Sequence, residues 1–139
     1  MESLRRLRSR EDAMACHGGC AVKGMRKATT DLFPFQTLDV YRAARELVVV
    51  VEKGAIRDAE LRDQATRAAK SVLLRLAEGL PLDAPGMRRK YFREAYGSLH
   101  ELVAAVDVAG ALGALDEGIV AEATALALRV RRMLRGLMT

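Results

Sequence analysis

Three residues near the N-terminus have side chains that bind soft metal ions. Cys16, His17 and Cys20 occur in the order Cys-His-Gly-Gly-Cys. A structural zinc site takes four ligands, and the sequence offers only one further histidine, His100. The intervening glycines favour a flexible, reduced segment instead. We therefore predict no metal site and no cofactor, with a metal-dependent switch through these three residues as an alternative.

A nucleophilic catalytic site needs a hydroxyl or thiol beside a histidine base and an orienting carboxylate. Ser98 precedes His100 by two positions, and Glu101 follows it directly. On a helix these neighbours point in different directions, because residues that face one another are three or four positions apart. The sequence also contains no glycine-rich phosphate loop. We expect a protein that is not an enzyme.

The cationic residues give a stronger signal, because they cluster. The 139-residue chain has a formal net charge of +5, which permits attraction to nucleic acid without demonstrating it. Three groups stand out: Arg88, Arg89, Lys90 and Arg93; Arg129, Arg131, Arg132 and Arg135; and Arg67, Lys70 and Arg75. The alternative is a solvated basic face, since cations at the C-terminus of a helix favour its dipole without any ligand.

The spacing of apolar residues predicts the elements that carry these side chains. From residue 38 onward, apolar residues recur three and four positions apart, as in amphipathic helices. The predicted helices cover residues 38–53, 58–79, 85–112 and 116–137. Gly54, Gly79 and Gly113 fit as helix ends.

The helix starts carry their own signals. Asp83, with Pro85 just inside the helix, is a candidate cap for the third helix, and Asp116 for the fourth. Asp58 and Arg62 are one turn apart in the second helix, which predicts a stabilising ion pair on its exposed face.

The short connections between these helices predict antiparallel neighbours. The fold class is therefore all-α: an antiparallel up-and-down four-helix bundle over residues 33–139, preceded by a flexible basic tail over residues 1–32. The start of the third helix and the end of the fourth then lie at the same end of the bundle, where two of the cationic groups meet. The residues predicted to contact nucleic acid are Arg88, Arg89, Lys90, Arg93, Arg129, Arg132 and Arg135.

The first two helices carry more apolar residues than one core-facing stripe requires. Consecutive apolar residues occur at positions 48–50 and 72–74. On an isolated bundle the excess would be exposed to water, which predicts a subunit interface. Its candidate residues are Val49, Val50, Leu73 and Leu74.

No stretch reaches the roughly 18 consecutive apolar residues that a membrane helix requires. The most apolar run, residues 47–51, ends at Glu52 and Lys53, and the first ten residues are too charged for a signal peptide. We expect a cytoplasmic protein with no membrane partner.

Four segments carry a resemblance to a known family. They read Phe35-Gln-Thr-Leu-Asp-Val-Tyr-Arg-Ala-Ala-Arg-Glu-Leu-Val48, Gln64-Ala-Thr-Arg-Ala-Ala-Lys-Ser-Val-Leu-Leu-Arg-Leu-Ala-Glu-Gly79, Tyr91-Phe-Arg-Glu-Ala-Tyr-Gly-Ser-Leu-His-Glu101 and Arg132-Met-Leu-Arg-Gly-Leu137. In this order they resemble the small proteins encoded in intervening sequences of bacterial 23S ribosomal RNA genes. The resemblance covers about residues 33–138. The chain departs from the family at Leu73-Leu74-Arg75-Leu76, where the family usually has Pro-Ser-Asn-Ile.

The resemblance implies a four-helix bundle that assembles into a homopentamer and has no known enzymatic activity. The accessory proteins of diversity-generating retroelements are similar in fold, and they form a basic pentameric barrel that works with a reverse transcriptase and its RNA. Together with the cationic groups, this leads us to expect a non-catalytic homo-oligomeric accessory protein that binds structured RNA, with a reverse transcriptase or another protein as a further partner. The alternative is a homo-oligomeric protein-interaction scaffold with no nucleic-acid role.

Overall fold

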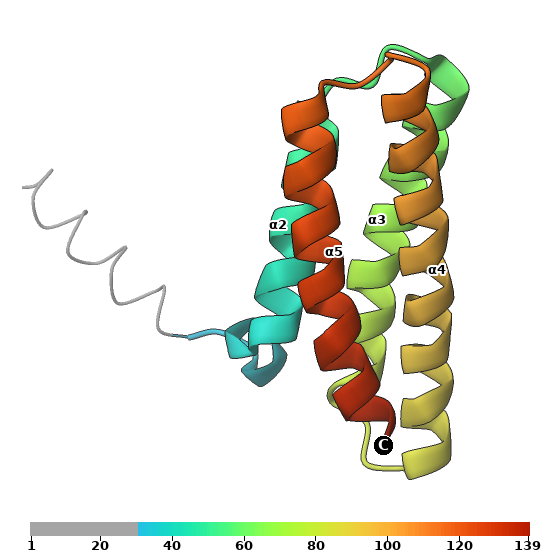
Figure 1. Cartoon of the computed structure of the whole chain (residues 1–139). Helices are drawn as coiled ribbons and strands as arrows, with labels where there is room; N and C mark the ends of the chain where they lie inside the picture. The colour runs from blue at the N-terminus through green and yellow to red at the C-terminus, as the bar shows by residue number, and fades with distance from the viewer. Residues whose placement is uncertain (1–30) are drawn as a thin grey trace, which may run out of the picture. The chain divides into compact units, whose positions relative to one another are not determined.

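The computed structural model of the chain describes residues 31–139. The predicted tail, apart from its last two residues, and the cluster of Cys16, His17 and Cys20 lie outside the described residues. Residues Pro34–Thr139 form one compact unit. It consists of a short 3-10 helix η1 (Pro34–Thr37) and the helices α2 (Asp39–Lys53), α3 (Ala59–Gly79), α4 (Pro85–Ala111) and α5 (Glu117–Met138) (Figure 1).

The four long helices pack as a closed ring. Each packs against its neighbour in sequence, and α2 also packs against α5; the contact between α3 and α4 is the most extensive (Figure 1). Successive helices run antiparallel because short connections join them. The predicted all-α, up-and-down four-helix bundle is therefore confirmed, and each helix end lies within one residue of its expected position.

The core forms from the apolar stripe of each helix. Phe92 is the largest fully buried side chain, and its ring lies close to the backbone of α3 at Gly79. Gly79 permits this approach, because a Cβ atom there would lie 2.9 Å from Cε1 of Phe92. Many other buried residues are alanines, such as Ala65 and Ala95, which let the helix backbones come together.

The end of α4 is built as the sequence indicates. Gly113 adopts a φ of +69°, and the amide of Ala114 donates to the carbonyl oxygen of Ala109 at 2.8 Å. The amide of Gly113 also donates to the carbonyl oxygen of Gly110, at 3.0 Å. This pair of bonds is a Schellman motif, so the prediction that α4 ends at Gly113 is confirmed.

Other end predictions need correction. The residue that caps α4 is Ala84, which has no capping side chain, so the prediction of Asp83 was wrong, whereas Pro85 does occupy the first helical turn. Asp58 caps α3, since its Oδ1 accepts from the amide of Leu61 at 3.0 Å; within residues 31–139 it forms no ion pair with Arg62. Its carboxylate serves the unpaired amides of the helix start instead.

The other two ends differ in detail. Asp116 occupies the capping position of α5, but its side chain makes no capping hydrogen bond. After α2, Gly54 stays right-handed, and Ala55 is the residue with a positive φ, 53°. No helix in the described part of the chain has both the length and the apolar character to cross a membrane.

Candidate nucleic-acid interface

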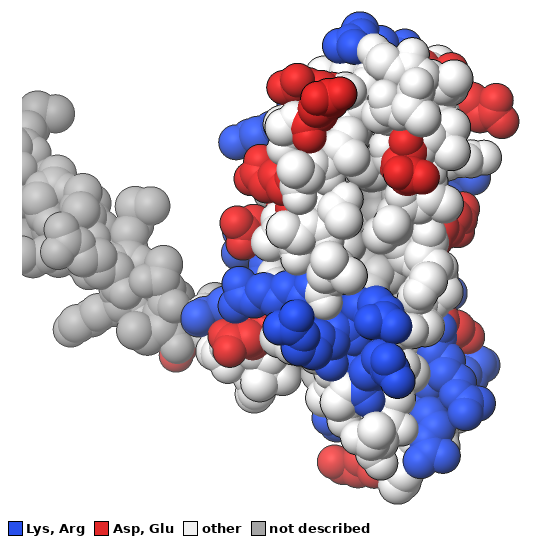
Figure 2. Space-filling model, in the orientation of Figure 1, with Lys and Arg blue, Asp and Glu red and all other residues white. Residues whose placement is uncertain are grey.

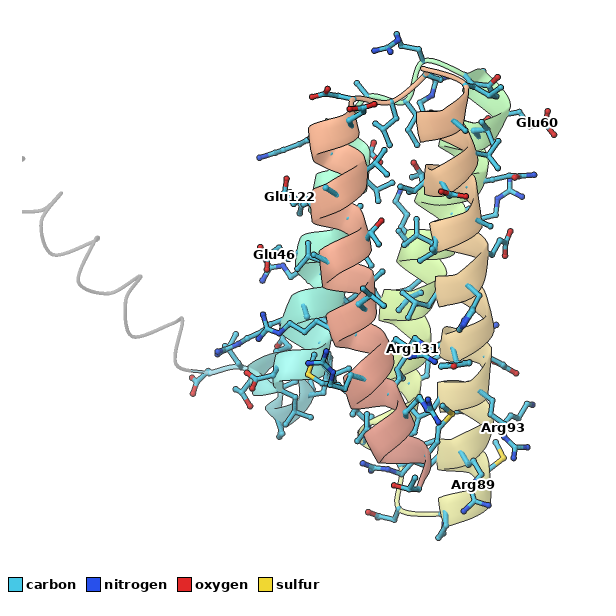
Figure 3. All side chains as sticks on the ribbon, in the orientation of Figure 1. Glu46, Glu60, Arg89, Arg93, Glu122 and Arg131 are labelled. Atoms are coloured by element: carbon cyan, nitrogen blue, oxygen red, sulfur yellow. The ribbon has the colours of Figure 1, made fainter. Side chains whose placement is uncertain are left out.

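The bundle brings the cationic groups of α4 and α5 to the same end. Figure 2 shows a band of basic side chains across one half of the face formed by α4 and α5. In Figure 3, Arg131 lies between α5 and α4, while Arg89 and Arg93 project from the first turns of α4. Of these side chains only Arg131 is half-buried, and the others are exposed. We name as the basic cluster Arg89, Lys90, Arg93, Arg129, Arg131, Arg132 and Arg135.

Within the described residues, no carboxylate forms an ion pair with the basic cluster. Within residues 31–139 the ion pairs join Arg75 to Glu78 and to Glu94, and none involves a residue of the cluster. Most acidic side chains of this face lie in the other half of the bundle (Figure 2), among them Glu122 near the start of α5 (Figure 3). Unpaired cations gathered on one surface produce a positive field that attracts polyanions.

Arg88 differs from the neighbouring cations because its side chain binds the protein backbone. Its Nη1 donates to the carbonyl oxygens of Leu80 at 2.8 Å and of Leu82 at 3.2 Å. Its guanidinium also lies 5.3 Å from the centre of the Phe92 ring. The half-buried Arg88 thus fastens the connection between α3 and α4, and we leave it out of the proposed interface.

The third cationic group does not extend the basic cluster. Arg75 donates from Nη1 to Glu78 at 2.9 Å, and its Nε lies 3.1 Å from Glu94. The hydrogen bond to Glu78 and the charge of Glu94 raise the pKa of Arg75 above its ordinary value. Arg67 and Lys70 lie in a groove that also contains the carboxylates of Glu52 and Asp63. On this side of the bundle, positive and negative side chains therefore alternate.

A groove between α4 and α5 adjoins the basic cluster. It encloses about 330 Å³ and is lined by Leu99, His100, Val103, Ala104 and Asp107 from α4 and by Thr124, Ala127, Leu128 and Arg131 from α5. We name it the α4/α5 groove. Most of its lining follows spacings of three and four along each helix, which places those residues on one face. This groove was not predicted from the sequence, although the two parallel spacings were the signal that could have found it.

His100 is held in place at the edge of this groove. Its ring lies 4.4 Å from that of Tyr96, and its Nδ1 is 2.8 Å from the Tyr96 carbonyl oxygen. Because a carbonyl oxygen can only accept, Nδ1 carries a proton and Nε2 is left for other partners. Ser98 faces α3 instead, with its Oγ 2.9 Å from Oγ of Ser71. Ser98 and His100 therefore lie on different sides of α4, as their spacing predicts.

The candidate residues of the predicted subunit interface differ in their exposure. Val49 and Leu74 are 42% and 61% exposed, as a subunit interface requires, but Val50 and Leu73 pack partly against the core. The subunit interface remains a prediction, with a smaller apolar surface on α2 and α3 than expected. Among residues 31–139, no group of three or more His, Cys, Asp or Glu side chains is placed to hold a metal ion.

Comparison with known proteins identifies the family to which this chain belongs. No curated protein sequence matches the chain. The family model described as 23S rRNA-intervening sequence protein matches residues 36–136, which span all four long helices almost completely. This agrees with the resemblance carried by the four sequence segments. The chain therefore belongs to the 23S rRNA-intervening sequence protein family.

Proposed function

We propose that this chain is a non-catalytic, homo-oligomeric accessory protein that binds structured RNA through the basic cluster. The observation that carries the proposal is the gathering of seven cationic side chains at one end of α4 and α5, with no carboxylate paired to any of them in the described part of the chain. Membership of a family named for a ribosomal RNA gene supports RNA as the polyanion.

The chemistry of the cluster suits phosphate. Six of its seven residues are arginines, whose planar guanidinium can donate two parallel hydrogen bonds to one phosphate. Contacts of this kind position RNA but do not read its sequence. Assembly, expected to be pentameric from the family resemblance, would repeat the cluster in every subunit. One RNA could then bind several copies at once, which raises the apparent affinity.

A salt series with one RNA hairpin tests the proposal. We expect the logarithm of the binding constant to fall steeply with the logarithm of the salt concentration. The variant Arg89→Glu/Arg93→Glu/Arg132→Glu should bind more weakly, with a slope shallower by about 0.7 to 0.9 for each phosphate that the variant no longer neutralises. Arg88 is left intact because it supports the fold. Filter binding measures both quantities, and thermal melting verifies that the variant is folded.

The matched control reverses charges elsewhere on the bundle. Arg62→Glu/Arg67→Glu/Lys70→Glu changes the net charge equally, but on α3 beside Glu52 and Asp63. It should retain the wild-type salt slope. A flat salt response of the wild type, or an equal loss of affinity in both variants, contradicts RNA binding through the basic cluster.

A protein-interaction scaffold is the second candidate, favoured by exposed apolar side chains on several helices. Leu74 is 61%, Leu112 66% and Leu128 53% exposed. The scaffold would bind a protein such as a reverse transcriptase and would use its charge only for solubility. Protein purified without nuclease separates the two functions: an ultraviolet absorbance ratio typical of pure protein, with a defined protein partner in pull-downs, favours the scaffold.

A further inference from the structure

We propose that the α4/α5 groove binds one unpaired nucleotide of the RNA, with its phosphate at Arg131 and its base edge at Asp107. Guanosine is the best match. This rests on the proposed RNA-binding function and adds a site that the basic cluster alone does not provide. The cluster offers cations for any RNA backbone, whereas the groove offers a shaped, partly apolar cleft for a single base.

The arrangement of the groove is polar at both ends and apolar between them. His100, Val103, Ala104 and Asp107 follow one another at spacings of three, one and three, and Thr124, Ala127, Leu128 and Arg131 repeat this pattern on α5. Each stripe therefore begins and ends with a polar residue and has two apolar residues in the middle. The volume of about 330 Å³ lies at the lower end of the range for small-molecule sites, roughly 300–1,000 Å³.

The antiparallel packing brings the polar residues into two opposed pairs. A Cβ atom at Gly110 would lie 2.9 Å from Val120, which fixes the register of the two helices. Counting from this contact, Asp107 is level with Thr124 to within one turn, and His100 with Arg131. Seven residues separate His100 from Asp107, a distance of about 10 Å along the helix. That distance is comparable with the extent of a nucleotide from its phosphate to the far edge of its base.

The phosphate end of the groove opens toward the basic cluster. Arg131 lines the groove, and Figure 3 shows it projecting between α5 and α4 above Arg93 and Arg89. Arg135 follows Arg131 by one turn and so lies on the same side of α5. An RNA backbone bound along the cluster would therefore place one phosphate near Arg131. Nε2 of His100 can accept a hydrogen bond here, such as one from a ribose 2′-hydroxyl group, because Nδ1 donates to the carbonyl oxygen of Tyr96.

The base end carries the opposite charge. Asp107 is exposed, and its carboxylate forms no ion pair or hydrogen bond with the described residues. A carboxylate only accepts hydrogen bonds, so it favours a base edge with N–H donors. Guanine has two adjacent donors, N1–H and the 2-amino group, which match the two carboxylate oxygens. Uracil places carbonyl oxygens on both sides of its single N–H group and is repelled.

The middle of the groove suits the flat faces of a base. Leu128 is 53% exposed and Val103 half-buried, so both retain apolar surface that a base would cover. Covering such surface is favourable because it removes apolar area from water. A ligand with an anion at one end, donors at the other and a flat body between them is complementary to all three parts of the groove.

Three RNA hairpins with the same stem test the proposal. Their loops differ at one unpaired position, which holds guanosine, inosine or uridine, and a blunt duplex of the stem serves as the loop-free reference. We expect the guanosine hairpin to bind about tenfold more tightly than the uridine hairpin. Inosine, which lacks the 2-amino group, should fall between them. The variant Asp107→Ala should reduce the guanosine-to-uridine ratio to about one.

Occluding the groove gives a second, independent readout. Leu128→Trp should lower the affinity for the guanosine hairpin to that for the blunt duplex and leave duplex binding unchanged. Val108→Trp is the matched control, because Val108 is 44% exposed on α4 but does not line the groove. Equal losses in both tryptophan variants, or equal affinity of the wild type for all three hairpins, would overturn the nucleotide site.

A titration with free nucleotide separates failure of this site from failure of RNA binding. Guanosine monophosphate should shift the methyl resonances of Leu128 and Val103, and uridine monophosphate should not. Steep salt-dependent binding of RNA without these shifts or any loop preference overturns the groove and retains the basic cluster. Shifts without salt-dependent RNA binding retain the groove as a nucleotide site and overturn the proposed RNA function. Shifts by a peptide from a partner, with none by either nucleotide, assign the groove to protein.

Discussion

The two ends of the bundle use arginine in opposite ways. At the end where the α2–α3 and α4–α5 connections meet, Arg57 joins them: its amide donates to the carbonyl oxygen of Ala114 at 2.9 Å, and its Nη2 donates to that of Gly113. At the end where α4 begins and α5 finishes, Arg88 also donates to backbone carbonyl oxygens, those of Leu80 and Leu82 in the α3–α4 connection. The arginines of the basic cluster, which lie toward that second end, bind no backbone carbonyl in the described part of the chain.

Among the four long helices of the described part of the chain, α4 is the one whose first turn has no acidic residue. α3 and α5 begin at the connection end with Glu60 and Glu117 in their first turns, where carboxylates are favourable beside the positive end of the helix dipole. α4 begins at the basic end, and its first turn has no acidic residue and no capping side chain, whereas α2, which begins at the same end, has Asp39 in its first turn. The start of α4 therefore retains its positive potential at some cost to the stability of α4. Net charge alone would not reveal this, because the difference lies in the placement of the charges.

The largest expected change in the free energy of unfolding tests the contrast between Arg88, which binds backbone carbonyls, and the basic cluster, which does not. Arg88→Ala removes two hydrogen bonds from a charged donor and a contact with the Phe92 ring, so it should lower the free energy of unfolding by about 2 kcal/mol. Arg89→Ala is the neighbouring control, exposed and without such contacts, and should change it by less than about 0.5 kcal/mol. Urea denaturation measures both. Equal effects would show that Arg88 belongs functionally with its neighbours.

The different roles of Arg88 and its cationic neighbours could not be predicted from the sequence, although the helices that carry them could. Apolar spacing predicts the helices because burial follows the 3.6-residue period, and Gly113 and Pro85 mark helix ends through their own backbone preferences. The task of Arg88 depends on where the carbonyls of Leu80 and Leu82 lie, which only the folded chain determines. The cap of α4 was misassigned by one residue, Asp83 for Ala84, because the chain turns into the helix one position later.

Part of the candidate site could be predicted from the sequence, and part could not. The joining of two cationic groups followed from antiparallel topology, which the short connections predict. The pairing of Arg75 with Glu94 did not, because the partners lie on different helices and their approach depends on how α3 and α4 pack. The α4/α5 groove was missed because apolar spacing predicts only which face of a helix is buried, whereas Val103 is half-buried, packs at the edge of the core and lines the groove.

A pair of capping substitutions sharpens the comparison of the helix starts. Asp58→Ala removes the side-chain cap of α3 and should lower the free energy of unfolding by about 1 kcal/mol. Ala84→Ser supplies the missing cap of α4 and should raise it by a similar amount, without changing the net charge. Both are measured by urea denaturation. If Ala84→Ser has no effect, the start of α4 is not the weak point that the comparison identifies.

A substitution in the turn after α2, at the opposite end of the bundle, should increase the free energy of unfolding by a smaller amount. Ala55 adopts a φ of 53°, a left-handed conformation that is strained for a residue with a Cβ atom. Ala55→Gly should raise the free energy of unfolding by about 0.7 kcal/mol, the relief of strain exceeding the greater entropy of glycine in the unfolded chain. Because Ala55 is remote from the basic cluster, RNA affinity should not change. A loss of stability would mean that the solution conformation of this turn is not left-handed.

The smallest expected effect on stability bears most directly on why α4 lacks an acidic residue at its start. Met87 is 47% exposed in the first turn, and Met87→Glu places a carboxylate there, which should stabilise the helix dipole by about 0.5 kcal/mol. The same carboxylate lies about one turn from Lys90 and should weaken RNA binding and flatten its salt dependence. Met87→Gln is the neutral control for both measurements. A gain in stability together with a loss of affinity, seen with Glu and absent with Gln, would show that the start of α4 favours binding over stability.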